Sequence, residues 1–251
     1  ERGTLEMAHR VRITCGQVFR YAVAAGLADR NIAADLKGAL KPVCGNHHPA
    51  LTDPKDVAGL LRAIDSFHGT FVVKCALQLL PLVFLRPGEL RQMEWSEVDF
   101  ENAQCNIPGD RMKMRQPHIV PLSRQALTIL QDLHPLTAHG RYVFPSLRTD
   151  LRPMSEVAIN ASLRRLGFDT RTEMTAHGFR AMARTILDEV LQVRPDYIEH
   201  QLAHAVRDPN GRAYNRTAHL AERRRMMQQW ADYLDSLKAG AKVIPFKMAE
   251  G

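Results

Sequence analysis

Apolar residues recur at helical spacing along most of this 251-residue chain, and one region breaks the pattern. The break consists of two short strand-like runs, 104–108 and 118–122, on either side of a basic loop with the sequence GDRMKMRQP. Two such runs with a short loop between them predict a small antiparallel hairpin. We therefore expect a mainly α-helical fold with a small antiparallel β-sheet, which is an α+β arrangement.

Turn residues divide the helical pattern into separate segments. The first runs over 4–25 and ends before Gly26, a residue type that often closes helices. A short second helix is expected at 31–40. Further helices are expected at 55–66, 70–85, from about Pro87 onward, and at 123–133, 155–166, 175–191, 196–205 and 218–238.

Residues 42–49, PVCGNHHP, contain Pro, Gly and Asn without periodicity, as is typical of a linker. The two helices before this segment are too small to bury a good core by themselves. We expect residues 1–45 to be the end of a helical domain and residues 46–251 to be the main domain. Because the chain opens with Glu1 rather than Met, we also expect upstream sequence.

The charge balance favours a polyanionic partner. Lys and Arg total 34 against 27 Asp and Glu, a net charge of +7, and nucleic acid is the commonest polyanion that basic proteins bind. The longest apolar stretch, Cys75–Leu85, is much shorter than the roughly 20 residues that cross a bilayer, and the chain opens without a signal-peptide pattern. We expect a cytoplasmic protein with no membrane partner.

The sequence contains few residue patterns that could bind a metal or a cofactor. Cys44 with His47 and His48 could form half of a metal site, but no second pair of ligands follows. A cluster of carboxylates that would hold Mg²⁺ is missing too. We expect no metal, no cofactor and free thiols in a reducing compartment. The cysteines, which show no CxxC spacing, are Cys15, Cys44, Cys75 and Cys105.

The segment TAHGFRAMART contains a histidine and an arginine that could bind an anion. His177 and Arg180 are three residues apart on a predicted helix, so both side chains should project from one face. A guanidinium offers a fork of donors and an imidazole offers a donor or a base, so the pair can hold one anionic oxygen. By itself the motif fits a solvated helix face better.

The segment LRPGELRQMEW places an arginine at a predicted helix start. Arg86 precedes Pro87, and Glu89 follows one turn later. Helix N-termini attract phosphate, and Glu89 could orient Arg86 through a bidentate pair. A capped helix with a surface ion pair explains the same residues equally well.

The basic loop of the predicted hairpin holds Lys113 between Arg111 and Arg115. A lysine on such a loop can donate a proton to a leaving oxygen. Basic hairpin tips also contact phosphate backbones, and the sequence does not rank Lys113 above its neighbours.

The segment EHQLAHAVRDPNGRAYNR contains a tyrosine close to a histidine and to arginines. Tyr214 follows His204 by ten residues, after a predicted turn, and lies between Arg212 and Arg216. An isolated tyrosine is usually a packing residue. A phenol, whose pKa is near 10, becomes a nucleophile at neutral pH only with cations and a base close by.

The order of these motifs resembles that of the tyrosine recombinase (phage integrase) family, over about Leu51–Leu237. The similar segments are LRPGELRQMEWSEVD, RMKMRQPHIVPLS, YVFPS, AHGFRAMART, EHQLAH and RAYNR. The run AYNRTAHLAERRRMMQQWADYLD is similar to integrases of prophages and genomic islands. The first 40 residues resemble the end of the family's helical core-DNA-binding domain.

The resemblance implies the family's catalytic-domain architecture and a nucleophilic role for Tyr214, which would form a 3′-phosphotyrosyl enzyme and release a 5′-hydroxyl without metal or ATP. Lys113 would be the general acid for that 5′ oxygen, and Glu89 would support the site. His177 would take the tyrosine proton, and His204 would bind the phosphate. The residues around the scissile phosphate would be Arg86, His177, Arg180 and His204, and the residues expected to contact DNA are Arg111, Arg115, Arg212 and Arg216.

The resemblance also implies partners: double-stranded DNA attachment sites and a homotetramer on DNA, with the piece monomeric when DNA is absent. The site of action would be chromosomal or phage DNA in a bacterial cytoplasm, where the enzyme would integrate or excise a prophage or genomic island. Two alternatives remain, a type IB topoisomerase-like enzyme and a catalytically inactive DNA-binding remnant.

Two positions depart from the family pattern. The family often has Gly two residues before the first arginine, where this chain has Phe84, and Gly before the second histidine, where it has Ala203. Both changes leave the backbone course near Arg86 and His204 open.

The last predicted helix allows two interpretations. Its apolar face, with Met226, Trp230 and Leu234, packs on its own domain or docks on a neighbouring subunit. The basic run 223–225 is interpreted as a solvated face, with DNA contact as the second choice.

Overall fold

The computed structural model describes residues 4–42, 48–112, 114–204 and 219–240, which form two compact units, Glu1–His47 and His48–Gly251. The expected domain assignment, with a boundary after residue 45, stays a prediction. Of the described helices, none combines the length and the apolar character that a membrane span requires.

The first unit consists of helix α1 (Leu5–Ala24) and a 3-10 helix, η1 (Ile32–Ala34), whose start is capped by the Asn31 side chain. The expected helix at 31–40 is therefore wrong beyond its first turn. Ile32 and Leu36 are exposed, so a longer helix would have no buried face to stabilise it, and Gly38 adopts a left-handed backbone. Most large apolar side chains of α1 are exposed as well.

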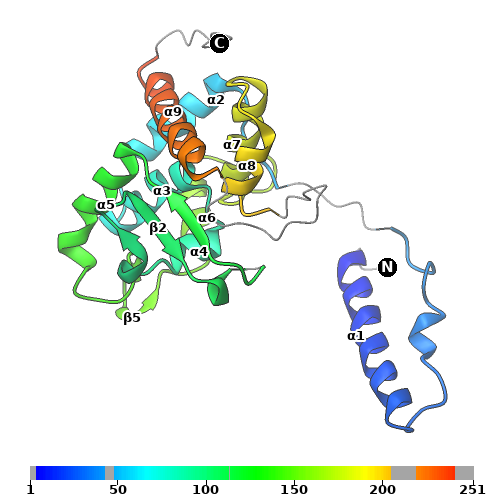
Figure 1. Ribbon diagram of the computed structural model, residues 1–251. Helices are drawn as coiled ribbons and strands as arrows, with labels where there is room; N and C mark the ends of the chain where they lie inside the picture. The colour runs from blue at the N-terminus through cyan, green and yellow to red at the C-terminus, as the bar shows by residue number, and fades with distance from the viewer. Residues whose placement is uncertain (1–3, 43–47, 113, 205–218, 241–251) are drawn as a thin grey trace. The chain divides into compact units, whose positions relative to one another are not determined.

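The second unit is built around helix α3 (Phe71–Val83), which is buried nearly all round from Cys75 onward. The helices that pack against α3 come from all parts of the unit (Figure 1). They are α2 (Pro54–Asp65), α4 (Pro87–Arg91), α5 (Arg124–Thr137), α6 (Ala158–Arg165), α7 (Gly178–Glu189) and α9 (Leu220–Lys238), and α8 (Pro195–Gln201) packs between α7 and α9.

The predicted hairpin is confirmed as the centre of a three-stranded antiparallel sheet. Strand β2 (Gln104–Ile107) pairs with β3 (His118–Pro121) on one side and with β1 (Val98–Asp99) on the other. A separate pair, β4 (Pro145–Ser146) and β5 (Thr149–Pro153), was not expected, because such short strands carry no readable alternation. Two further 3-10 turns flank the sheet, η2 (Trp95–Glu97) and η3 (Gly109–Arg111).

The apolar face of α9 packs on its own unit, which decides between the two interpretations for these side chains. Met226, Trp230 and Leu234 are buried, and the Trp230 indole N–H donates to the Pro81 carbonyl at 2.8 Å. The Trp230 ring also meets Phe84 edge-on, with 5.8 Å between the ring centroids. Burial of these large side chains fastens α9 over the end of α3.

The interpretation of 223–225 as a solvated face is wrong for its first residue. Arg223 is 1% exposed, and its guanidinium donates to the Gln201 side chain and to the Ile119 carbonyl. Arg224 donates to the Asn102 carbonyl at 2.6 Å, whereas the Arg225 side chain stays 77% exposed. Helical spacing places Arg223 on the same face as the buried Met226 and Trp230, so the charge enters the core with its acceptors.

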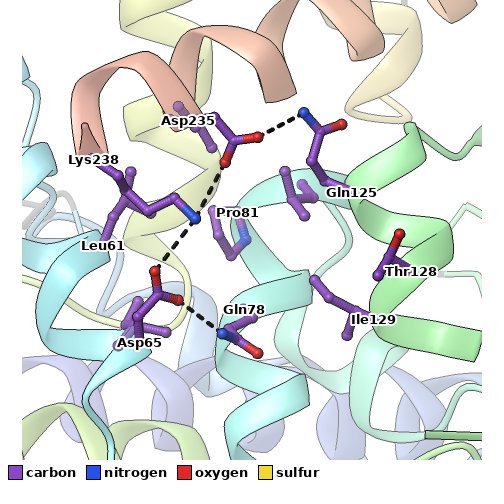
Figure 2. A pocket seen from close by; sticks show the side chains of 12 residues that line it. Leu61, Asp65, Gln78, Pro81, Gln125, Thr128, Ile129, Asp235 and Lys238 are labelled. Atoms are coloured by element: carbon purple, nitrogen blue, oxygen red, sulfur yellow. Dashed lines mark hydrogen bonds and ion pairs between the residues drawn. The ribbon is translucent and has the colours of Figure 1, made fainter. Parts of the chain in front are cut away.

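A cavity of about 250 Å³ lies between α2, α3, α5 and α9 (Figure 2). At its rim the Lys238 ammonium lies between Asp65 and Asp235, at 3.3 and 3.2 Å. Gln78 and Gln125 bind the same two carboxylates, so the rim ties the end of α9 to three other helices. The cavity is not lined by any of the candidate site residues that the structure describes.

Candidate active site

Arg86 lies at the N-terminus of α4 and is oriented by Glu89. One Glu89 oxygen accepts the backbone N–H of Arg86 at 2.9 Å, and the other accepts its guanidinium at 2.8 Å. Glu89 is only 7% exposed, so this is not the surface ion pair of the alternative interpretation. The expected bidentate pair is thus replaced by one guanidinium contact and one backbone contact, and this largely buried pair at a helix start holds the arginine in one orientation.

Arg180 is held by two turns that come from distant parts of the chain. It is 5% exposed on α7, and its guanidinium donates to the carbonyls of Phe84 and, at 2.7 Å, Leu202. Burial, and next the charge of Arg86, lower the pKa of Arg180 to about 10, so the guanidinium stays charged at neutral pH.

Both turns have left-handed backbones at residues other than glycine. Phe84 has φ 59° and ends α3, and Ala203 has φ 50° and follows α8. These are the two positions where the sequence departs from the family pattern. In this chain the left-handed conformation, which glycine favours, occurs at residues with side chains, at some cost in backbone energy.

His204 connects Arg180 to a carboxylate. Its Nδ1 lies 2.5 Å from Glu199 Oε2, and its Nε2 lies 3.1 Å from the Arg180 guanidinium. Because a guanidinium only donates, we assign the neutral ring a proton on Nδ1, which donates to Glu199. Glu199 is itself held by Arg184, from which it accepts at 2.7 Å. The imidazole of His204 therefore lies between a fixed carboxylate and the Arg180 guanidinium.

His177 caps the start of α7 and does not lie within the helix, which begins at Gly178. The expected helix start at 175 is therefore three residues early, since Thr175 instead accepts the Gly178 N–H through its hydroxyl at 2.9 Å. Burial, then the charges of His48 and Arg180, lower the pKa of His177 to about 4. A neutral imidazole at pH 7 can accept a proton.

The structure brings four predicted residues together from separate elements. Arg86, Arg180 and the protonated form of His204 all disfavour a positive charge on His177, and the Arg86 charge acts on Arg180. Four groups that bear or can accept a positive charge suit an anion with several oxygens. These four residues, which we call the cationic cluster, are Arg86 directly before α4, His177 directly before α7, Arg180 on α7, and His204 after α8.

Other predicted residues are placed differently or are not described. Arg111 forms an ion pair with the buried Glu97 and donates to the Glu89 carbonyl at 3.2 Å, which leaves its guanidinium little surface for DNA. Arg115 is exposed in the loop, and its DNA contact stays a prediction. The predicted roles of Lys113, Arg212, Tyr214 and Arg216 stay predictions, because these four residues lie outside the described ones.

A buried polar network around Gln201, next to the cationic cluster in the chain, was not predicted from the sequence. Gln201 Oε1 accepts from Arg223 at 3.0 and 2.8 Å, and Gln201 Nε2 donates to the Val83 carbonyl at 3.5 Å. The Gln201 carbonyl lies 3.1 Å from His118 Nε2, and burial lowers the pKa of His118 to about 3. The network joins α9 to the residues beside Phe84 and Leu202. The one sequence feature that could have indicated this network is the helical spacing that places Arg223 on the apolar face of α9.

The half metal site falls mostly outside the part of the chain that the structure describes, and within that part no group of three potential ligands occurs. Cys44 and His47 lie outside the described residues, and His48 contacts the His177 ring.

Comparison with known proteins agrees with this geometry. The sequence profile of the phage integrase family matches residues 51–219, and that of the phage integrase central domain matches residues 1–39. Protein IntB of Escherichia coli K12 is 38% identical over 99% of this chain and 65% of its own length. The integrase of Enterobacteria phage P4 is 39% identical over 93% of this chain and 56% of its own length. The chain thus spans little more than half to two thirds of these relatives.

The fold is also shared with solved structures. A lambda integrase (residues 75–356) dimer bound to a COC′ core site matches 81% of this chain and 74% of its own, with a TM-score of 0.62 and 21% identity. The integrase of mycobacterium phage Brujita matches with a TM-score of 0.57 and 13% identity. The expected fold class, mainly helical with small antiparallel sheets, is confirmed.

Proposed function

Since the chain belongs to the phage integrase family, we propose that it is a tyrosine-type site-specific recombinase that integrates or excises a prophage or genomic island. It would cleave and rejoin DNA strands through a 3′-phosphotyrosyl intermediate. The cationic cluster carries this proposal, because it gathers a phosphate-binding set of residues from three separate elements.

The cluster suits the charge changes of phosphoryl transfer. Negative charge develops on the nonbridging oxygens, and preoriented arginines stabilise that charge most strongly when they need not reorganise. Arg86 is oriented by Glu89, and Arg180 is held by two carbonyls before any substrate binds. Loss of one such group should lower the cleavage rate by about 10²–10³-fold.

The covalent step follows from this arrangement. The Tyr214 oxygen would bond to phosphorus while the bond from phosphorus to the 5′ oxygen breaks. His177, whose pKa of about 4 keeps it neutral, would take the phenolic proton, and Lys113 would protonate the 5′ oxygen. Since one phosphoester replaces another, rejoining is the same step in reverse and needs no ATP.

Double-stranded DNA attachment sites are the proposed substrate, and a homotetramer on DNA is the proposed assembly. Lambda integrase has been solved as a dimer bound to a core site and as a tetramer bound to a Holliday junction. The net charge of +7 supports binding to a polyanion.

A covalent-capture assay tests the nucleophile. The chain is incubated in EDTA with a pool of nicked duplexes that have a randomised centre, and SDS-resistant adducts are isolated and sequenced. The wild-type chain and the control Tyr142→Phe should form adducts at a shared sequence, and Tyr214→Phe should form none. Adducts with Tyr214→Phe would show that another residue attacks.

The same assay separates the alternatives. A topoisomerase-like enzyme would relax supercoiled plasmids and form adducts without a shared sequence. An inactive remnant would bind the pool and form no adduct with any variant.

A further inference from the structure

His48 lies directly on the candidate proton acceptor. The ring centroids of His48 and His177 are 4.3 Å apart, with an angle of 40° between the ring planes. His48 is the first residue of the second unit, so it immediately follows the segment that joins the two units. None of the motifs that define the cationic cluster includes it.

Pro49, the residue after His48, is anchored to Thr175, two residues before His177. The Pro49 carbonyl accepts the backbone N–H of Thr175 at 3.1 Å and its hydroxyl at 3.4 Å. These bonds fix the chain at Pro49, and His48 therefore enters the site from a defined point.

Gly178 makes this close approach possible. A Cβ at residue 178 would lie 2.2 Å from the Pro49 carbonyl oxygen and 3.2 Å from Ala50 Cα. No side chain fits there without displacing the backbone of Pro49 and Ala50. The ring contact, the Thr175 bonds and the missing Cβ thus all join the same short segment to the start of α7.

The contact bears on the environment of His177. Burial is the largest cause of its lowered pKa, and the charge of His48 is the next, ahead of Arg180, Arg86 and His204. His48 is itself exposed, and its ring lies against one side of the His177 ring.

We propose that His48 is a positioning residue for the recombination reaction, because its ring holds the His177 imidazole in place. Since His48 directly follows the segment between the two units, the position of that segment's end would affect the orientation of the proton acceptor. This inference rests on the proposed function only for its effect on catalysis. The effect on the His177 ring exists in the free protein and is measured there.

The first measurement is a pH titration of the histidine ring protons by NMR on the full chain, with His177 assigned by His177→Gln. In the wild type, His177 should titrate near 4. In His48→Ala the midpoint should move toward the ordinary value of 6.5, because the His177 ring loses both the neighbouring ring that shields it from water and the positive charge that this ring can carry. His48→Phe keeps the cover and loses the charge, so its midpoint should lie between the two.

Gly178→Ala supplies an independent variant, because it displaces Pro49 without altering either ring. It should raise the His177 midpoint as His48→Ala does. His139→Ala, a change at an exposed histidine elsewhere, should leave the midpoint unchanged. An unchanged midpoint in both His48→Ala and folded Gly178→Ala would overturn the proposal.

The second measurement is the rate of adduct formation as a function of pH. Loss of ring positioning should lower the rate by about ten- to a hundredfold, with DNA affinity unchanged and partial rescue by His48→Phe. If His48→Ala cleaves at the wild-type rate across the pH range, the positioning role is wrong. If the wild type itself forms no adduct, the proposed function fails, and the titration still decides whether His48 holds His177.

Discussion

At the scale of single residues, two backbone positions hold the guanidinium of Arg180. Phe84 and Ala203 both have positive φ values, and the adjoining carbonyls of Phe84 and Leu202 accept from Arg180. A left-handed residue with a Cβ is strained, so each turn costs stability that the arginine contacts offset.

Ala203→Gly should therefore stabilise the chain by about 1 kcal/mol, because glycine adopts this conformation without the steric cost. The measurement is the midpoint of urea unfolding. The matched control is Ala181→Gly, at an exposed position within α7, which should instead destabilise by about 1 kcal/mol. A destabilised Ala203→Gly would show that the turn carries no such strain.

The buried His118 makes stability depend on pH. Its pKa of about 3 in the folded chain lies below the ordinary 6.5, so the unfolded chain binds the proton more tightly. Stability should be complete above pH 6.5 and should fall as the pH decreases toward 3, by up to about 1.4 kcal/mol per pH unit. His177 adds an effect of the same sign that solvent weakens.

Urea unfolding measured between pH 7 and pH 4 tests this expectation. His118→Gln, which keeps a donor for the Gln201 carbonyl, should show a shallower fall than the wild type. His139→Gln should match the wild type. Equal slopes in all three chains would mean that His118 is protonated as easily in the folded state as in the unfolded state.

At the scale of elements, α9 is joined to the site by a buried arginine. Arg223 donates to Gln201, the last residue of α8, and to Ile119 on β3. Gln201 in turn donates to Val83 at the end of α3. Helices α9, α8 and α3 and strand β3 thus share one polar network, and α3 and α8 end a few residues before Arg86 and His204.

Arg223→Met should destabilise the chain by about 2–4 kcal/mol, because the buried acceptors on Gln201 and Ile119 lose their donor. Arg225→Met removes an exposed arginine two residues away and should change stability by less than about 0.5 kcal/mol. Urea midpoints measure both changes. Similar small effects for the two variants would show that the network adds little to stability.

At the scale of the whole molecule, the two units differ in how well they bury apolar surface. The second unit has a continuous core around α3, whereas the first leaves side chains such as Leu5, Val18 and Tyr21 exposed. An isolated helix with so little burial is marginal in water.

Deletion of residues 1–47 should therefore leave the thermal unfolding of the second unit within about 3 °C of the full chain, because the removed helix contributes little stability. Backbone amides of α1 should exchange with solvent much faster than those of α3. A large fall in the unfolding temperature, or protected α1 amides, would show that the first unit stabilises the second.

The sequence by itself determined the features that depend on local spacing. The helical period, the strand-like runs around residues 104–122 and the order of motifs from Arg86 to Tyr214 can all be read along the chain. These features were enough for the fold class, the family and the candidate site residues.

Only the tertiary structure decided which charges are buried and where the backbone bends. The inward turn of Arg223, the held position of Arg180 and the contact of His48 with His177 each join residues 22 or more positions apart. Such contacts leave no periodic signal, because a guanidinium enters the core only where carbonyls from other elements happen to supply its acceptors.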